Sequence, residues 1–454
     1  GSHFFYKTNG SEFFIRGVAY QDNGHFASES TQIIDPFGDG PTCQRDIAYF
    51  QKLGLNTVRA YAVDASQDHS ECMQYLADAG IYVITDLGGN NPISQQDPQW
   101  NYPLYDQFTS VVDAFQNYTN ILGFFVGNEI VNTTGTSNAA AAIKAATRDI
   151  KAYIKKKNYR TIPVGYSSGD DADVRMLIAD YLNCGDQDDS IDMLGMNLYS
   201  WCGDSSLTES GYDQRIDDFQ NYSIPLFLSE YGCNTPSPRN FTEVSAIYGN
   251  EMTKVFSGGI VYQYYQDEAD FGLVSIEGDS VSTSADFSNL SKQLAKATPS
   301  STAISAYSPS NSPQSCPATG TSWSASPTLP PIPYARLCTC MMQSLTCVVP
   351  SNQSTDPSIG QSLSYICQTS ADLCLGAETS PLKGQYGAYT VCNSSELVSW
   401  AYNQYYLSQS SSETACSKVG GVIQSPVKNL ASDCSDLLHQ AGAAGTGTIT
   451  STPT

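Results

Sequence analysis

Short apolar runs, separated by longer stretches of mixed polar and apolar residues, dominate the first 265 residues of the chain. Some runs stay apolar at nearly every position, as in Ile121-Leu-Gly-Phe-Phe-Val126. This pattern is typical of strands that are buried on both faces. The runs predict eight strands, over residues 13–20, 57–63, 82–87, 121–126, 162–166, 193–200, 225–231 and 259–265.

Segments with helical character separate these strands. They cover residues 44–53, 70–79, 105–118, 139–157, 172–181, 214–220 and 241–252. Strands that alternate with helices over roughly 250 to 300 residues are typical of a (β/α)8 barrel, whose active site lies at the C-terminal ends of its strands. The predicted fold class is therefore α/β, a TIM barrel, followed by a small disulfide-rich and mainly helical domain.

Two of the apolar runs lead directly into a glutamate. Glu129 follows the fourth predicted strand, and Glu230 lies at the end of the seventh. One such glutamate is most often a strand end in solvent, but a carboxylate beside an apolar run is costly unless it has a partner or a task. Both ends belong to the same face of the barrel, and two carboxylates are the minimum equipment for cleaving a glycosidic bond.

The neighbours of the two glutamates suggest different roles. We expect Glu129 to be the acid/base, because Asn128 beside it can bind the hydroxyl next to the reacting carbon. Glu230 is then the nucleophile. A hydrogen bond from Tyr199 and the positive charge of Arg59 are expected to keep Glu230 ionised, which would separate the two pKa values.

Further polar residues fall at the ends of the predicted strands. They are Tyr20, Gln21, Arg59, Tyr61, Asp64, Asp86, Asn197, Tyr199, Tyr262 and Tyr264. A single tyrosine is more often a core residue than a ligand contact. Their convergence on one rim favours a binding site there.

Composition limits the class of ligand. The 454 residues carry a formal charge of -23, with a pI near 4.3, so nucleic acid and an anionic membrane surface would be repelled. A neutral polysaccharide fits this charge, and the 29 Tyr, 17 Phe and 4 Trp residues offer rings for stacking on sugars. No apolar run approaches the ~18 residues of a transmembrane helix. We expect no cofactor and no metal.

Composition also divides the chain. Residues 4–298 form the predicted catalytic barrel, and residues 299–333 are a Ser- and Pro-rich connector. Residues 334–436 form a cysteine-rich module, and residues 437–454 are a small polar tail, expected to be a disordered terminus or the start of an anchor spacer. Gly1-Ser2-His3 is typical of an expression-tag remnant and is left out of the prediction.

The chain has 14 cysteines, an even number, which predicts disulfides made in an oxidising compartment. They are Cys43, Cys72, Cys184, Cys202, Cys233, Cys316, Cys338, Cys340, Cys347, Cys367, Cys374, Cys392, Cys416 and Cys434. The eight in the module allow 105 pairings, and the sequence does not choose among them. A zinc site at Cys338-Thr-Cys340 is disfavoured, because the chain has four histidines. Asn-X-Ser/Thr sequons also point to secretion, at Asn9, Asn117, Asn132, Asn221, Asn240, Asn289, Asn352 and Asn393.

Several motifs together resemble a known family. They are Arg16-Gly-Val-Ala-Tyr-Gln21, Val58-Arg-Ala-Tyr61, Gly127-Asn-Glu-Ile130, Gly195-Met-Asn-Leu-Tyr-Ser-Trp-Cys202 and Phe227-Leu-Ser-Glu-Tyr-Gly-Cys233. In this order they resemble the fungal β-1,3-glucanosyltransferases of glycoside hydrolase family 72. The cysteine-rich unit, with Gly384-Gln-Tyr-Gly-Ala-Tyr-Thr-Val-Cys392-Asn, resembles the cysteine-box module of carbohydrate-binding family 43.

The resemblance implies a retaining enzyme that remodels the cell wall. Such an enzyme cuts a β-1,3-glucan internally and joins the new reducing end to the non-reducing end of another β-1,3-glucan. The family's acid/base falls on Glu129 and its nucleophile on Glu230, and its sugar contacts fall on Gln21, Tyr61, Asp86, Asn128, Asn197, Tyr199 and Tyr262. The resemblance also implies the disulfides Cys43–Cys72, Cys202–Cys233 and Cys184–Cys316. We expect a monomeric, extracellular glycoprotein whose only membrane link is a glycosylphosphatidylinositol anchor, with its attachment signal beyond Thr454.

Two other functions are compatible with these residues. A plain endo-β-1,3-glucanase would use the same two glutamates, and the first chemical step does not separate hydrolysis from transfer. A non-catalytic glucan-binding adhesin is a third possibility, against which the presence of both glutamates argues. The cysteine-rich module either binds glucan or buttresses the barrel.

Overall fold

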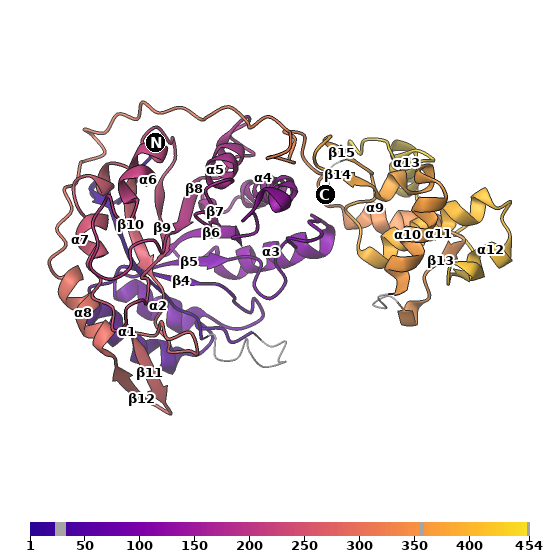
Figure 1. The fold of residues 1–454 in the computed structure, drawn as a ribbon. Helices are drawn as coiled ribbons and strands as arrows, with labels where there is room; N and C mark the ends of the chain where they lie inside the picture. The colour runs from indigo at the N-terminus through magenta and orange to yellow at the C-terminus, as the bar shows by residue number, and fades with distance from the viewer. Residues whose placement is uncertain (23–32, 354–357, 452–454) are drawn as a thin grey trace.

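The computed structural model describes residues 1–22, 33–353 and 358–451 (Figure 1). In these residues, eight parallel strands close into a barrel in the order β10-β3-β4-β5-β6-β7-β8-β9. The strands are β3 (Ile15–Ala19), β4 (Thr57–Ala60), β5 (Tyr82–Asp86), β6 (Ile121–Asn128), β7 (Val164–Ser168), β8 (Met193–Asn197), β9 (Leu226–Tyr231) and β10 (Phe256–Val261). The predicted TIM barrel is confirmed.

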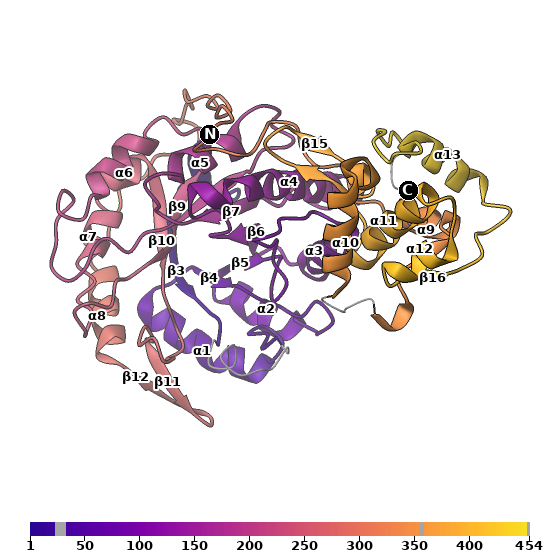
Figure 2. The same ribbon diagram turned by 45° about the vertical axis from the view of Figure 1, so that its right-hand side comes forward.

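Helices surround the ring of strands, as Figure 2 shows. They are α1 (Gly40–Leu53), α2 (Ser70–Asp78), α3 (Tyr102–Phe115), α4 (Ala140–Lys156), α5 (Arg175–Asn183), α6 (Tyr212–Phe219), α7 (Glu243–Ile247) and α8 (Ala285–Leu294). The helix predicted over residues 241–252 is shorter than expected. It consists of α7 and, separately, a 3-10 turn, η2 (Met252–Lys254), because the chain turns at Gly249, whose N–H donates to Ala246.

The two faces of each strand pack against different partners, which explains the unbroken apolar runs. Phe125 of β6 points into the barrel, where its ring stacks on that of Phe227 with centroids 6.0 Å apart. The preceding residue, Phe124, belongs to the larger core between strands and helices. Both residues are fully buried, so period-two alternation leaves no polar position in the run.

Two hairpins were not predicted. β1 (Phe4–Phe5) pairs with β2 (Glu12–Phe13), and β11 (Val274–Glu277) pairs with β12 (Ser280–Thr283). Phe13 of the first hairpin packs with the residues inside the barrel. The first hairpin therefore contributes to the core at the end opposite the predicted site.

The connector is extended but held against the barrel. Cys316 is joined to Cys184, and Trp323 is 1% exposed, with its ring 5.3 Å from that of Tyr181. Figure 1 shows this segment running across the outside of the barrel before it reaches the second domain. The Ser- and Pro-rich stretch is therefore not a free linker.

The C-terminal module is mainly helical, as predicted. Its helices are α9 (Ala335–Ser344), α10 (Ser358–Thr369), α11 (Ser394–Ser408), α12 (Glu413–Lys418) and α13 (Ser432–Ala441), with short turns η3 (Ser351–Gln353) and η4 (Ala371–Ala377). Its two-residue strands are β13 (Cys347–Val348), β14 (Thr379–Ser380), β15 (Gln385–Tyr386) and β16 (Val422–Ile423). They form separate antiparallel pairs, β13 with β16 and β14 with β15.

Seven disulfides pair all of the cysteines, each of which lies in the described part of the chain. In the barrel and connector they join Cys43 to Cys72, Cys202 to Cys233 and Cys184 to Cys316, the pairs that the resemblance implies. In the module they join Cys338 to Cys392, Cys340 to Cys434, Cys347 to Cys416 and Cys367 to Cys374. Within the described residues, no helix combines the length and the apolar character that crossing a membrane requires.

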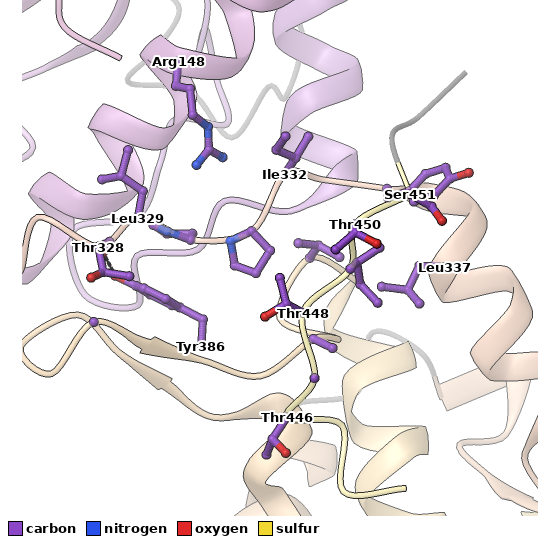
Figure 3. A pocket seen from close by; sticks show the side chains of 18 residues that line it. Arg148, Thr328, Leu329, Ile332, Leu337, Tyr386, Thr446, Thr448, Thr450 and Ser451 are labelled. Carbon is purple, nitrogen blue, oxygen red and sulfur yellow. Dashed lines mark hydrogen bonds between the residues drawn. The ribbon is translucent and has the colours of Figure 1, made fainter. Parts of the chain in front are cut away.

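The end of the chain differs from the expected disordered tail. α13 continues to Ala441, and residues 442–451 fold back on the module, where the Ala388 N–H donates to the Gly445 carbonyl. Figure 3 shows residues 446–451 along one side of a cavity of about 450 Å3 that the connector and Arg148 of α4 also line. The described part of the tail is thus part of the module.

Candidate active site

The C-terminal ends of β6 and β9 carry the two glutamates. Glu129 directly follows β6 and has φ 50°, a left-handed conformation that is uncommon for a residue with a side chain. Its N–H donates to the Ser167 carbonyl of β7 at 2.9 Å. Such a conformation at a strand end is a feature of functional sites and sets the direction in which the carboxylate points.

Irregular strand pairing brings several polar side chains to the same level. The β8–β9 register shifts between Met196 and Asn197, so that Asn197 lies opposite Glu230, and the β6–β7 register shifts before Asn128. Bulges of this kind re-aim side chains near active sites. They explain how Ser229 and Glu230, which are consecutive, both contribute to one polar cluster.

Glu230 is buried and accepts hydrogen bonds on both carboxylate oxygens. The Tyr199 hydroxyl donates to Oε2 at 2.7 Å, and the Tyr61 hydroxyl donates to Oε1 at 2.9 Å. Arg59 Nη1 lies 3.5 Å from Oε1. Burial and the nearby Glu230 charge raise the pKa of Tyr61, and the same two causes raise that of Tyr199, so both phenols stay protonated donors.

The ionisation of Glu230 differs from the expectation. Burial raises its pKa, and Arg59, Tyr199 and Tyr61 lower it. The expected contacts are present and act in the expected direction, but burial outweighs them, so the pKa of Glu230 lies above its ordinary value.

Arg59 organises the floor of the site. Its guanidinium is fully buried and forms a two-point ion pair with Asp86, with Nε to Oδ1 at 3.1 Å and Nη2 to Oδ2 at 2.9 Å. Nη2 also donates to Asn128 Oδ1 at 3.0 Å. The described hydrogen bonds of Asn128 use only its Oδ1, which leaves its NH2 group for a ligand.

Asn197 links Glu129 to the polar cluster around Glu230. Its Nδ2 donates to Glu129 Oε1 at 2.8 Å and to Asn128 Oδ1 at 3.2 Å. Its Oδ1 accepts from the hydroxyls of Ser167 at 3.1 Å and Ser229 at 2.8 Å. Two donors on the carbonyl oxygen fix the orientation of this amide, so the NH2 group must face Glu129.

A cavity of about 530 Å3 opens beside this cluster. It is lined by Tyr61, Asn128, Tyr199, Glu230, Cys233, Asn234, Tyr262 and Phe271. Most of these are aromatic rings or amides, which suit a ligand with apolar faces and many hydroxyls. A carboxylate with an attached set of donors therefore faces a space large enough for a sugar unit.

Two of the predicted sugar contacts, Gln21 and Asp86, use their polar groups within the protein. Gln21 is fully buried, and its amide binds the backbone: Nε2 donates to Ile34, and Oε1 accepts from Tyr61 and Ala62. It positions the segment that carries Tyr61. Asp86 accepts hydrogen bonds from Arg59 on both of its carboxylate oxygens.

Three other residues of the predicted rim, two tyrosines and one aspartate, also have contacts that differ from the expectation. The hydroxyls of Tyr20 and Tyr264 both bind Asp46 of α1, on the outer side of the barrel. Asp64 caps a loop by accepting hydrogen bonds from Ser66. None of the three lines the cavity.

Several residues of the site could not be predicted from the sequence. Ser167 and Ser229 are buried in strands and gave no signal beyond ordinary strand composition. Phe271 and Asn234 lie in loops, where hydrophobic periodicity carries no information. Their nearness to the ends of the eighth and seventh strands is the only signal that the sequence offered.

Metal binding has little support among the described residues. The clusters that bring three possible ligand atoms together are Cys338, Cys392 and Glu396, and Cys340, Cys434 and Asp433. In both, the cysteines are joined in a disulfide. A disulfide sulfur has no thiolate to offer a metal ion.

Comparison with known proteins agrees with this geometry. The model of the glucanosyltransferase family matches residues 1–298, and the model of the X8 domain matches residues 345–422. A 1,3-beta-glucanosyltransferase of Arthroderma benhamiae is 46% identical, over 100% of this chain and 84% of the relative. The 1,3-beta-glucanosyltransferase gas1 of Schizosaccharomyces pombe is 42% identical, over 100% of this chain and 83% of the relative.

Solved structures agree as well. The apostructure of a mutant of Saccharomyces cerevisiae Gas2p has a TM-score of 0.86 and 35% identity, over 97% of this chain and 96% of that chain. A mutant of the same protein in complex with laminaritetraose and laminaripentaose has a TM-score of 0.82 and 36% identity, covering 94% and 92%.

Proposed function

The chain belongs to the glucanosyltransferase family, and from this premise we propose that it is a β-1,3-glucanosyltransferase. It cleaves a β-1,3-glucan internally and transfers the new reducing end to the non-reducing end of a second β-1,3-glucan. The observation that supports this most directly is the linkage of Glu129 to the Glu230 cluster through one amide, Asn197, beside an open cavity.

In the first half-reaction Glu230 attacks the anomeric carbon of the sugar above it. The bond to the glycosidic oxygen breaks, its electron pair stays on that oxygen, and Glu129 supplies the proton. Asn197 holds the Glu129 carboxyl in place, at 2.8 Å. The reducing-end fragment leaves, and the retained segment is bound to Glu230 as an ester.

In the second half-reaction a hydroxyl at the non-reducing end of an acceptor glucan takes the place of the leaving group. Glu129, now ionised, accepts its proton, and the oxygen attacks the anomeric carbon and displaces Glu230. Two inversions at one carbon retain the β configuration. The free NH2 group of Asn128 donates to the sugar hydroxyl beside the reacting carbon, and Tyr61, Tyr199 and Tyr262 contact the ring.

Incubation with a laminari-oligosaccharide reduced at its end tests this function. Separation of the products by size should show chains longer than the donor. Products that are only shorter would instead identify a β-1,3-glucanase. An absence of any turnover by protein that is folded, as judged by a cooperative thermal transition, would leave only glucan binding.

The cysteine-rich module buttresses the barrel in this proposal. Tyr102, at the start of α3, joins the two units: its N–H donates to the Val391 carbonyl at 2.8 Å, and its hydroxyl accepts from Asn393 at 3.0 Å. Deletion of residues 334–454 should therefore cause aggregation, and retained solubility with lost glucan binding would assign the module to binding instead. We also propose that the enzyme works as an extracellular monomer on the cell-wall glucan and is held to the membrane by a lipid anchor.

A further inference from the structure

A buried arginine outside the catalytic cluster holds one wall of the cavity. Arg239, in the segment between β9 and α7, is 2% exposed. Its guanidinium donates to the carbonyls of Gly232 at 3.2 Å, Tyr262 at 2.6 Å and Phe271 at 2.5 Å. Gly232 lies two residues after Glu230, so a single side chain ties the nucleophile's strand end to two aromatic residues of the cavity.

A second buried group fixes this arginine. Asp286, in the first turn of α8, accepts from Arg239 Nε at 2.5 Å and from the Arg239 N–H at 2.9 Å. Asn289, one turn further along α8, donates to the Arg239 carbonyl at 2.9 Å. A buried ion pair contributes little to net stability compared with an apolar alternative. The effect of this pair therefore lies in the geometry that it imposes.

That geometry is an aromatic wall made by Tyr262 and Phe271. The Phe271 ring lies edge to face with the ring of Tyr262, with centroids 5.3 Å apart, and with the ring of Tyr199, at 6.0 Å. Phe271 is half-buried and lines the cavity. Because a phenyl ring has no polar group, its exposed face offers only apolar contact.

The position of the wall indicates which part of the substrate it meets. Tyr199, against which Phe271 packs, donates its hydroxyl to Glu230. Glu230 lines the same cavity, whereas Glu129 is not among its lining residues. The sugar above the nucleophile is the one that stays on the enzyme, so the wall faces the retained segment of the donor.

We propose that Phe271 is a sugar-contacting residue for the retained donor segment, and that Arg239 and Asp286 are the positioning pair that holds it there. This inference rests on the proposed function. It adds a specificity-determining ring to the site and assigns a task to a charge pair that takes no part in proton transfer.

Kinetics with laminari-oligosaccharide donors test the ring. Phe271→Leu should raise the donor KM about tenfold, the scale of one well-placed aromatic contact, whereas Phe271→Tyr keeps the ring and should stay close to wild type. The ratio of transfer to hydrolysis should not change, because the acceptor side is intact. An unchanged KM in Phe271→Leu, or a changed ratio without a change in KM, would overturn the proposal.

Asp286→Asn tests the positioning pair, with Asp433→Asn, at the exposed ion pair to Arg336, as the matched control. The first should raise the donor KM severalfold more than it lowers kcat, and the second should do neither. Equal loss of kcat and gain in KM would indicate a merely structural role and overturn the positioning assignment. Thermal unfolding shows whether Asp286→Asn is misfolded. In that case the kinetics of Phe271→Leu decide whether the ring contacts the sugar.

Direct binding separates this inference from the proposed function. Calorimetry compares laminaripentaose binding to Glu129→Gln and to the double variant with Phe271→Leu. About tenfold weaker binding by the double variant supports the sugar contact even if no transfer product is ever found. Equal affinities reject the contact while the transferase proposal stands.

Discussion

Replacement of Tyr199 by phenylalanine should move the acid limb of the pH profile to higher pH. The substitution removes the 2.7 Å hydrogen bond to Glu230 Oε2 and leaves the ring in place. That hydrogen bond favours the ionised carboxylate and therefore lowers its pKa, against the larger effect of burial. In the proposed mechanism Glu230 must be ionised to attack. Activity should therefore fall as the pH drops through the pKa of Glu230, and a higher pKa brings that loss at a higher pH.

The size of the shift follows from the strength of the bond. A hydrogen bond to a charged group contributes about 1.5–3 kcal/mol, and one pKa unit corresponds to about 1.4 kcal/mol. The acid limb should therefore move by about one to two pH units. Tyr61→Phe removes the 2.9 Å bond to the other oxygen and should shift the limb in the same direction.

The measurement is kcat/KM as a function of pH, which reports ionisation in the free enzyme. Tyr20→Phe is the control, because that hydroxyl binds Asp46 on the outer side of the barrel. Its profile should coincide with that of the wild type. An acid limb that stays in place in Tyr199→Phe, or moves to lower pH, would refute the role of Glu230 as the ionised nucleophile.

Three further changes give distinct outcomes. Glu129→Gln should lower kcat about 10²–10⁴-fold, the usual contribution of a general acid, in size-resolved product assays; undiminished turnover would rule Glu129 out. Ser229→Ala removes one of the two donors that orient Asn197 and should lower kcat/KM about fivefold. Ser210→Ala is the control, and a Ser229→Ala rate equal to that of the wild type would contradict the prediction. The double variant Cys184→Ser, Cys316→Ser removes the disulfide between two cysteines that are 132 residues apart in the sequence. Denaturant titration should show a stability about 2–5 kcal/mol lower. An equal midpoint and slope would show that this disulfide is dispensable.

The barrel and the positions of the two glutamates could be predicted from the sequence because both depend on the local pattern of apolar residues. A strand buried on both faces, such as β6, has no choice but to be apolar throughout, and the polar residue that follows it marks the strand end. Residues beyond a strand end lose this rule. β10 ends at Val261, so Tyr262 reaches the cavity while Tyr264, two residues on, turns away to Asp46.

Two other differences arise from packing between distant segments. Composition identifies Gly445 as part of a disordered tail, yet its φ is 66° and a side chain there would lie 2.7 Å from the Gly376 Cα. The glycine permits close approach rather than disorder. Likewise, Arg239 is one more charged residue in the sequence, and the four partners of its side chain come together only in the folded chain.

The stapled connector limits how the module can assist the enzyme. A tethered domain raises local substrate concentration by sweeping a volume that grows with the length of its tether. Here Cys316 and Trp323 fix the chain to the barrel, so lengthening or shortening the Ser- and Pro-rich stretch before Cys316 would leave the module's reach unaltered. Any glucan chain that the module binds is therefore held at one fixed distance and orientation relative to the catalytic face.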